Sequence, residues 1–274
     1  MVTDYPGTTG LRFNFINGGT SGLMSNVKIR KAISYSIDRE EMIDAVYGRY
    51  KPAYSYVAPA ITFNGSSYRD QVGEVIEDEY NEYVGDPDKI VALFQEGLDE
   101  LGVETPIEDI TLTYLTSGST TEGQAEREYI QQSLEETLGL TVELSVAGDT
   151  SLFIADRNEG NYDFFLGGWY SDYNDPLDFL YTNYTDAYGM SFGGYSNSDY
   201  DALADQLVGE TDMDKRLDIY KQMEQILLLD DCAFAPIYYS TKQVLLQNWV
   251  KDYRTSSFGA SAEFIWTYID GKNQ

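Results

Sequence analysis

Three aspartates, each three residues from the next, follow a stretch rich in glycine and aromatic residues. The segment "DFFLGGWYSDYNDPLDFL" covers residues 163–180 and contains Asp172, Asp175 and Asp178. A carboxylate among aromatic rings can bind an ammonium group, and a pair of carboxylates can also hydrolyse a glycosidic bond. Which chemistry applies depends on which aspartates are free of structural duties.

Two of these aspartates have structural roles at a predicted helix start. Asp175 is a good N-cap, Pro176 suits the first helical position, and Asp178 lies in the first turn, where negative charge is favourable. Asn174 suits the preceding turn. Asp172 has no such role, so it is either a binding residue or an ordinary solvated turn aspartate.

The residues before Asp172 predict an accessible strand end. A strand over 162–169 ends here, and open α/β sheets bind ligands at the carboxyl ends of their parallel strands. Gly167 and Gly168 lack side chains, so another backbone can approach closely. Aromatic walls are supplied by three neighbouring rings, those of Trp169, Tyr170 and Tyr173. The combination suits an ammonium group carried on an extended chain.

The composition excludes several functions. The 274 residues include 18 basic and 46 acidic residues, for a net charge of −28, which disfavours nucleic acid as a partner. The absence of histidine excludes Ser-His-Asp and Cys-His catalysis and histidine metal ligation. The single cysteine, Cys232, lies between apolar runs and is interpreted as a small core residue. We expect no metal and no cofactor.

The middle of the chain alternates between strand-like and helical patterns. A helix over 86–102 is capped by Asp86, begins at Pro87 and ends at Gly102. The segments that follow are a strand over 109–116, a helix over 121–139, a strand over 140–148, a helix over 150–159 and the strand over 162–169. This order predicts an α/β sheet with parallel strands.

The flanking regions add further elements. We expect a strand over 11–17, helices over 26–37 and 39–48, helices over 198–210 and 212–230, and strand-like pieces over 234–240 and 243–249. Residues 50–85 are predicted to be a long ordered loop, pinned by Tyr56, Val57 and Phe63. The two ends of the chain resemble strands without a partner.

Five motifs in this order resemble the oligopeptide/dipeptide family (family 5) of extracellular solute-binding proteins, which serve ABC importers. The motifs are "FNFINGG…SNVKIRKAISYSIDREEMIDAVYG", "GDPDKIVALFQEGLDELGV", "NYDFFLGGWYSDYNDPLDFL", "YSNSDYDALADQL" and "YKQMEQILLLDDCAFAPIYY". Each motif alone is weak, but five in the right order over about 250 residues are specific.

The resemblance implies an α/β, periplasmic-binding-protein-like (type II) lobe with a mixed sheet flanked by helices. It also implies a partial chain that lacks the N-terminal lobe. Residues 1–20 would be a hinge-crossing strand segment, 21–246 the C-terminal ligand-binding lobe, and 247–274 a return segment toward the missing lobe.

The resemblance assigns roles to the residues singled out above. Asp172 would hold the α-amino group of a peptide, and the main chains of Gly168 and Tyr170 would pair with it. Trp169 and Tyr173 would line the cleft, and Asn17 is added as a ligand contact. Some relatives carry an arginine at the position of Leu166 that binds a short ligand's carboxylate, so its absence leaves peptide length open.

The implied function is that of the non-enzymatic binding component of an ABC importer, which captures oligopeptides and delivers them to a membrane permease. Its implied location is the periplasm or, through a lipid anchor, the outer face of the cytoplasmic membrane. Three alternatives stay open: a non-peptide cargo such as a sugar, nickel chelate or haem, a secreted carbohydrate-active protein, and a calcium site in "DYNDPLD".

Overall fold

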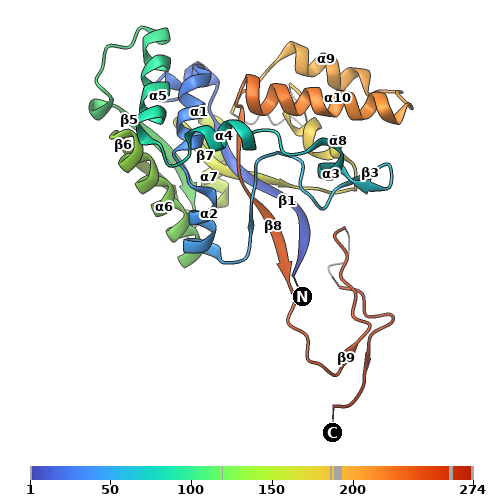
Figure 1. Ribbon diagram of the computed structural model, residues 1–274. Helices are drawn as coiled ribbons and strands as arrows, with labels where there is room; N and C mark the ends of the chain where they lie inside the picture. The colour runs from blue at the N-terminus through green and yellow to red at the C-terminus, as the bar shows by residue number, and fades with distance from the viewer. Residues whose placement is uncertain (1, 119, 186, 188–192, 259–261, 273–274) are drawn as a thin grey trace.

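The computed structural model describes residues 2–118, 120–185, 187, 193–258 and 262–272. Within these residues a six-stranded mixed sheet has the order β2-β8-β1-β7-β5-β6 (Figure 1). Its strands are β1 (Val2–Phe13), β2 (Lys51–Pro52), β5 (Thr111–Ser117), β6 (Thr141–Ala147), β7 (Phe164–Tyr170) and β8 (Phe234–Gln243). The predicted mixed sheet is confirmed.

The parallel part of the sheet is the part that the sequence predicts best. β5 pairs in parallel with both β6 and β7, and the connecting helices are α6 (Thr121–Leu138) and α7 (Thr150–Glu159). Each helix begins at a side-chain cap, Thr120 or Asp149, and ends at a left-handed glycine, Gly139 or Gly160.

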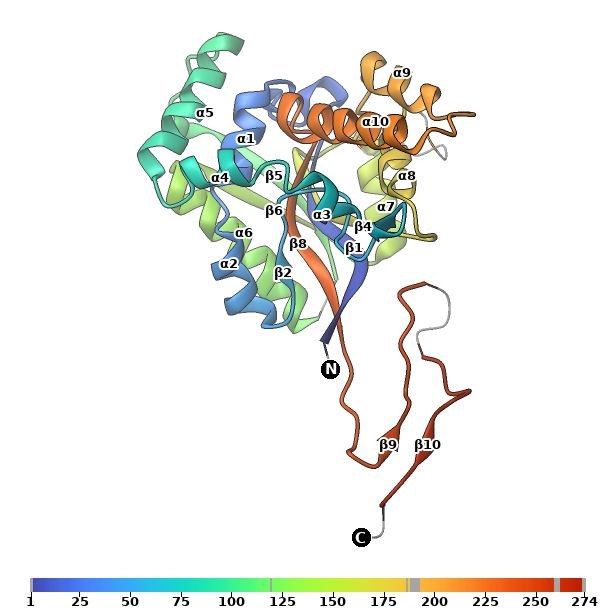
Figure 2. The ribbon, with the colours of Figure 1, turned by 45° about the vertical axis from the view of Figure 1, so that its right-hand side comes forward.

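Helices cover both faces of the sheet. One core cluster lies against α1 (Val27–Tyr35), α5 (Pro87–Leu101) and α6, and the other lies against α8 (Pro176–Leu180), α9 (Ser198–Gln206) and α10 (Met213–Gln225). Figures 1 and 2 show α1, α5 and α6 on one side and α9 and α10 on the other. α5 has the predicted start and end, since Asp86 accepts a hydrogen bond from the main-chain N–H of Lys89 and Gly102 is left-handed.

Residues 50–85 differ from the predicted loop. They contain β2, the short hairpin β3 (Thr62–Phe63) and β4 (Ser66–Ser67), and helices α3 (Tyr68–Val72) and α4 (Glu77–Tyr83). Elements this short show no clear hydrophobic periodicity, so they could not be predicted from the sequence. The predicted anchors Tyr56, Val57 and Phe63 are buried.

The N-terminal strand also differs from its prediction. β1 ends at Phe13 and lies inside the sheet, paired with β7 on one side and β8 on the other. It appeared unpaired in the sequence because β8 begins more than 200 residues later, at Phe234. Residues 244–249 form no strand. Beyond them the two-residue strands β9 (Val250–Lys251) and β10 (Tyr268–Ile269) pair, and Arg254 forms an isolated antiparallel bridge with Glu263.

The pairing of β1 and β8 extends beyond the rest of the sheet. Val2–Asp4 pair with Thr241–Gln243, whereas β7 stops opposite Gly7. Figures 1 and 2 show the two strands leaving the body together. The segment after β8 at first runs away from the helical layers and then turns back, so that Phe258 packs against the α8–α10 core cluster.

Candidate functional site

The candidate site lies along one edge of β7. On one side β7 pairs with β1 over its whole length, from Phe164 opposite Phe13 to Tyr170 opposite Gly7. On the other side β5 pairs only with Phe164 and Phe165. Within the described part of the chain, residues 166–170 therefore have no strand on that side.

The hydrogen bonds of β7 show which main-chain groups face this open edge. The main-chain N–H of Ser171 donates to the carbonyl of Pro6 at 2.8 Å, so it faces β1. Because successive residues of a strand direct these groups to opposite sides, those of Trp169 also face β1, and those of Gly168 and Tyr170 face the open edge. Gly168 and Tyr170 are the two pairing residues that the sequence predicts.

Asp172 lies just beyond this edge, where the parallel strands β5, β6 and β7 have their carboxyl ends. Its side chain is exposed. Among the described residues its carboxylate makes no hydrogen bond and no ion pair, while its main-chain N–H donates to Asp178 at 2.8 Å. The carboxylate is therefore free to meet a ligand.

Asp178 has a larger role than the helix-turn position that the sequence predicts. Its side chain is 1% exposed. Its Oδ2 accepts hydrogen bonds from the Trp169 indole at 3.0 Å, the Ser171 hydroxyl at 2.7 Å and the Asp172 main chain at 2.8 Å. No local sequence rule relates an acid to donors six to nine residues earlier, so this role was not predictable.

The remaining polar residues of the turn are structurally engaged, as predicted. Asp175 caps α8 by accepting from the main-chain N–H of Leu177 at 2.8 Å, and it also accepts from the Tyr220 hydroxyl at 2.8 Å. Arg216 lies 3.7 Å from its carboxylate. The side chain of Asn174 contacts Thr62 of β3. Asp175 is thus unavailable as the second member of a catalytic carboxylate pair.

The three aromatic rings lie in different environments. The Trp169 ring is partly buried against the α8–α10 core cluster. The Tyr170 ring lies over Gly7, beside the Tyr5 ring at 5.9 Å between centroids, and its hydroxyl lies 3.2 Å from that of Ser240. Tyr173 is 47% exposed. Tyr170, at 49%, and Tyr173 are thus the two accessible rings among the three predicted walls, and Tyr173 directly follows Asp172.

The structure does not bring Asn17 together with the other predicted site residues. Asn17 lies in a turn after β1, with a φ of 54°. Since β1 and β7 are antiparallel, Asn17 follows the end of β1 that pairs with the start of β7. Asp172 follows the opposite end of β7, roughly 20 Å away at about 3.4 Å per residue.

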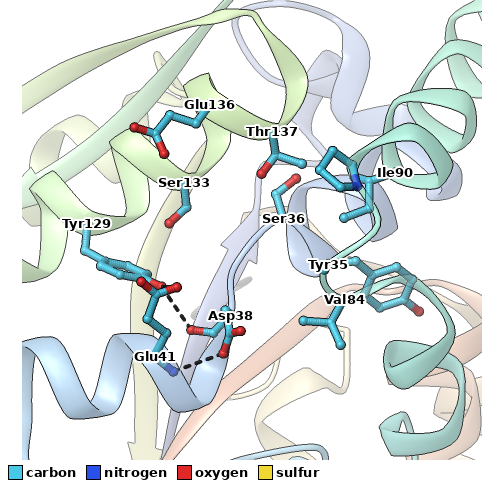
Figure 3. Close-up of a pocket in the computed structure, with 12 residues that line it drawn as sticks. Tyr35, Ser36, Asp38, Glu41, Val84, Ile90, Tyr129, Ser133, Glu136 and Thr137 are labelled. Atoms are coloured by element: carbon cyan, nitrogen blue, oxygen red, sulfur yellow. Dashed lines mark hydrogen bonds between the residues drawn. The ribbon is translucent and has the colours of Figure 1, made fainter.

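Another hollow with acidic walls lies on the α1–α5–α6 side of the sheet (Figure 3). It has a volume of about 200 Å³, and its carboxylates are those of Asp38, Glu41 and Glu136. Asp38 caps α2 (Arg39–Met42), Glu41 lies 3.3 Å from the Tyr129 hydroxyl, and Glu136 accepts from Gln132 at 2.7 Å. These carboxylates hold the surrounding helices, unlike the unengaged carboxylate of Asp172.

The described residues contain neither a metal-binding cluster nor a membrane-spanning helix. In the described ranges no group of three or more acidic or cysteine side chains is arranged to hold a metal ion. No helix in the same ranges is both long enough and apolar enough to cross a bilayer.

Residues 2–191 match the family described as "Bacterial extracellular solute-binding proteins, family 5 Middle". The chain is 31% identical to the dipeptide-binding protein DppE of Bacillus subtilis over 225 residues, which cover 81% of this chain and 39% of DppE. It is 31% identical to the oligopeptide-binding protein OppA of B. subtilis over 235 residues, which cover 84% of this chain and 39% of OppA. The chain thus spans about two fifths of these relatives.

Solved structures agree with this relationship. The oligopeptide ABC transporter substrate-binding domain of Bacillus anthracis has a TM-score of 0.79 and 26% identity, and peptide-bound OppA of Listeria monocytogenes has a TM-score of 0.77 and 30% identity. Each match covers 98% of this chain and 50% of the other chain. The chain therefore belongs to family 5 of the bacterial extracellular solute-binding proteins.

Proposed function

We propose that this chain supplies the ligand-binding lobe of an ABC importer's peptide receptor. The observation that carries the proposal is the position of the unengaged Asp172 carboxylate at the end of the open β7 edge. An extended peptide offers a positive α-amino group followed at once by main-chain donors and acceptors. Asp172 matches the amine, and Tyr170 and Gly168 match the main chain.

The pairing explains how one site could accept many sequences. Main-chain hydrogen bonds are the same for every peptide, so they contribute affinity without selecting side chains. The amine adds a charge-assisted hydrogen bond to a carboxylate, which is stronger than a bond between neutral groups. We propose Trp169 and Tyr173 as walls for the first side chains of the ligand.

The proposed receptor has two lobes joined by a hinge. The β1–β8 pair, which continues beyond β7, supports residues 1–20 as one hinge-crossing segment. Residues 247–258 first leave the body (Figure 2) and then turn back, so that Phe258 packs against the α8–α10 core cluster. We propose 247–274 as the return segment toward the other lobe, with residues 21–246 forming the lobe described here. The proposed partners are an oligopeptide, the other lobe and a membrane permease.

The proposed location is outside the cytoplasmic membrane, in the periplasm or at the outer membrane face through a lipid anchor. It follows from the family, whose description is that of extracellular solute-binding proteins. Relatives such as the periplasmic murein peptide-binding protein MppA of Escherichia coli support the periplasmic alternative.

A non-peptide cargo is the second candidate, because the heme-binding protein A of Haemophilus influenzae is 27% identical over 250 residues. Haem has no α-amino group that would need Asp172. The free carboxylate beside an open strand edge therefore favours peptides.

Calorimetric titration of the full-length receptor tests the proposal. The ligands are a pool of short peptides and the same pool after N-acetylation, each titrated into the wild type and Asp172→Ala. We expect micromolar or tighter binding of free-amine peptides, weakened at least tenfold by acetylation or by the substitution, because a charged hydrogen bond is lost. Equal binding of both pools would rule out Asp172 as the residue that holds the amine. Binding of neither pool would rule out peptides as the ligand.

A further inference from the structure

We infer that Asp178 is a positioning residue of the amine site: its buried carboxylate holds the turn that carries Asp172 and supplies a second negative charge beside it. The inference rests on the proposed function, because it assigns a further residue to the same site. It separates two tasks, contact with the amine by Asp172 and orientation of Asp172 by Asp178.

Three hydrogen bonds converge on the carboxylate of Asp178. The indole of Trp169, the hydroxyl of Ser171 and the main-chain N–H of Asp172 all donate to one oxygen, Asp178 Oδ2, at 2.7–3.0 Å. Both ends of this arrangement are fixed, because Trp169 belongs to β7 and Asp178 belongs to α8. The turn between strand and helix is therefore tied at three points to a side chain that is 1% exposed.

Asp178 is buried without a cationic partner among the described residues. Buried carboxylates are normally paired with a cation or a metal. Among the described residues, no lysine or arginine forms an ion pair with Asp178 or with Asp172, whereas the neighbouring Asp175 lies 3.7 Å from Arg216. The carboxylates of Asp178 and of Asp172, whose main-chain N–H donates to Asp178, thus lack a counter-charge among the described residues, and the ammonium group of a ligand would supply it.

Asp163 provides a matched comparison within the same strand region. It is also buried, at 0% exposure, and accepts three hydrogen bonds from neutral donors, but through both oxygens: Oδ1 from the Ser21 N–H at 2.9 Å and the Ser21 hydroxyl at 2.7 Å, and Oδ2 from the Thr113 N–H at 2.7 Å. It precedes β7, whereas Asp178 follows it. Replacement of Asp163 therefore tests loss of a buried carboxylate far from the amine site.

The test measures amine selectivity, defined as the affinity for the free-amine peptide pool divided by that for the N-acetylated pool. The full-length receptor is compared with Asp178→Asn, Asp163→Asn and Asp172→Ala. An asparagine oxygen can accept the bonds made to Asp178 Oδ2, so Asp178→Asn removes charge while keeping the turn. We expect selectivity to fall about tenfold in Asp178→Asn and to stay unchanged in Asp163→Asn.

A spectroscopic measurement checks the hydrogen bond without any peptide. The full-length receptor is labelled with ¹⁵N-tryptophan, and the Trp169 indole resonance is assigned by its loss in Trp169→Phe. Asp178→Asn should move this resonance upfield, because an amide oxygen is a weaker acceptor than a carboxylate. Ser171→Ala removes a different hydrogen bond to Asp178 and should leave the indole bond in place. If Asp178→Asn does not fold, Ser171→Ala replaces it in the measurement of amine selectivity.

The outcomes separate this inference from the proposed function. If Asp172→Ala loses selectivity but Asp178→Asn does not, the charge role of Asp178 is overturned and the peptide site stands. If Ser171→Ala, which removes one of the three hydrogen bonds to Asp178, also keeps full selectivity, the positioning role is overturned. An unchanged indole resonance in Asp178→Asn would also overturn it. If Asp172→Ala itself keeps full selectivity, the amine anchor fails and the role of Asp178 fails with it.

Discussion

Gly7 and Tyr170 lie opposite each other on β1 and β7, and the Tyr170 ring occupies the space where a side chain at Gly7 would begin. A Cβ atom at Gly7 would lie 2.4 Å from Cδ1 of that ring. The ring belongs to a residue that is 49% exposed and whose main chain faces the open edge of β7. Gly7 therefore allows Tyr170 to lie flat across β1 and reach Ser240 on β8.

Substitution at Gly7 should move the Tyr170 ring rather than unfold the protein. In Gly7→Ala the clash involves the end of a flexible side chain, so we expect a loss in unfolding free energy of about 1 kcal/mol or less. In Gly10→Ala the new Cβ would lie 2.2 Å from the Ala235 main-chain oxygen, which is fixed in the sheet. We expect that substitution to cost about 3 kcal/mol.

Urea unfolding of both variants measures the difference. Nuclear Overhauser effects between Tyr5 and Tyr170, whose ring centroids are 5.9 Å apart, report whether the ring has moved. Equal losses of stability in the two variants would show that the Tyr170 ring is held as firmly as the sheet backbone.

Glu224 should be among the most stabilising polar residues. Its carboxylate is 0% exposed and accepts from the main chains of Tyr56 and Val57 and from the Tyr68 hydroxyl, at 3.0–3.2 Å, and it pairs with Arg69. Glu224→Gln would leave the Arg69 charge buried without a partner. We expect a loss of about 3–5 kcal/mol in unfolding free energy.

Urea midpoints of Glu224→Gln, Arg69→Met and the double variant give the coupling between the two residues. Arg69→Met should cost less in the Glu224→Gln background than in the wild type, because the charge without a partner is then removed. Additive effects would contradict the ion-pair explanation.

The sequence predicted those elements whose signals are local. Asp86, Pro87 and Gly102 define α5 by capping rules alone, and the alternation of strands and helices over 109–170 defines the parallel strands. The role of Asp175 as a helix cap is confirmed for the same reason, since its partner is the N–H two residues later.

Features that depend on distant partners were not predictable. β1 obtains its second neighbour from β8 at the other end of the chain, and Asn17 was placed near the ligand before the direction of β1 was known. The three donors to Asp178 meet only once β7 and α8 are packed. The sequence thus identified Asp172 by elimination, but it could not identify the residue that orients Asp172.

Glu126 should make stability depend on pH. Burial raises the pKa of this carboxyl above its ordinary value of 4.5, although the Tyr47 hydroxyl donates to it and opposes the shift. The folded protein then binds the proton more tightly than the unfolded chain, so this contribution to stability is lost as the pH rises above about 4.5. Glu126→Gln keeps an acceptor for Tyr47 and removes the charge.

We expect the melting temperature of Glu126→Gln, relative to wild type, to increase as the pH is raised from 4 to 8. Thermal unfolding across this range measures it. The exposed Glu128 on the same helix, replaced by Gln, is the control and should show a difference that hardly varies with pH. A flat difference for both variants would indicate that Glu126 is solvated in solution.

The open edge of β7 can be tested by removing a single N–H group. Proline at position 170 has no N–H to offer a peptide, and the group it removes faces away from β1, so the sheet loses no hydrogen bond. Tyr170→Ala is the matched control, because it removes the ring and keeps the N–H. We expect the two variants to differ by no more than about 1 kcal/mol in unfolding free energy. Peptide affinity should be about tenfold lower in Tyr170→Pro than in Tyr170→Ala.

Ser171→Pro is the opposite case, because the Ser171 N–H faces β1 and donates to the Pro6 carbonyl at 2.8 Å. Loss of this N–H should weaken the β1–β7 pairing itself. Calorimetry on the full-length receptor measures the affinities, and equal peptide binding by Tyr170→Pro and Tyr170→Ala would mean that no ligand strand forms on this edge.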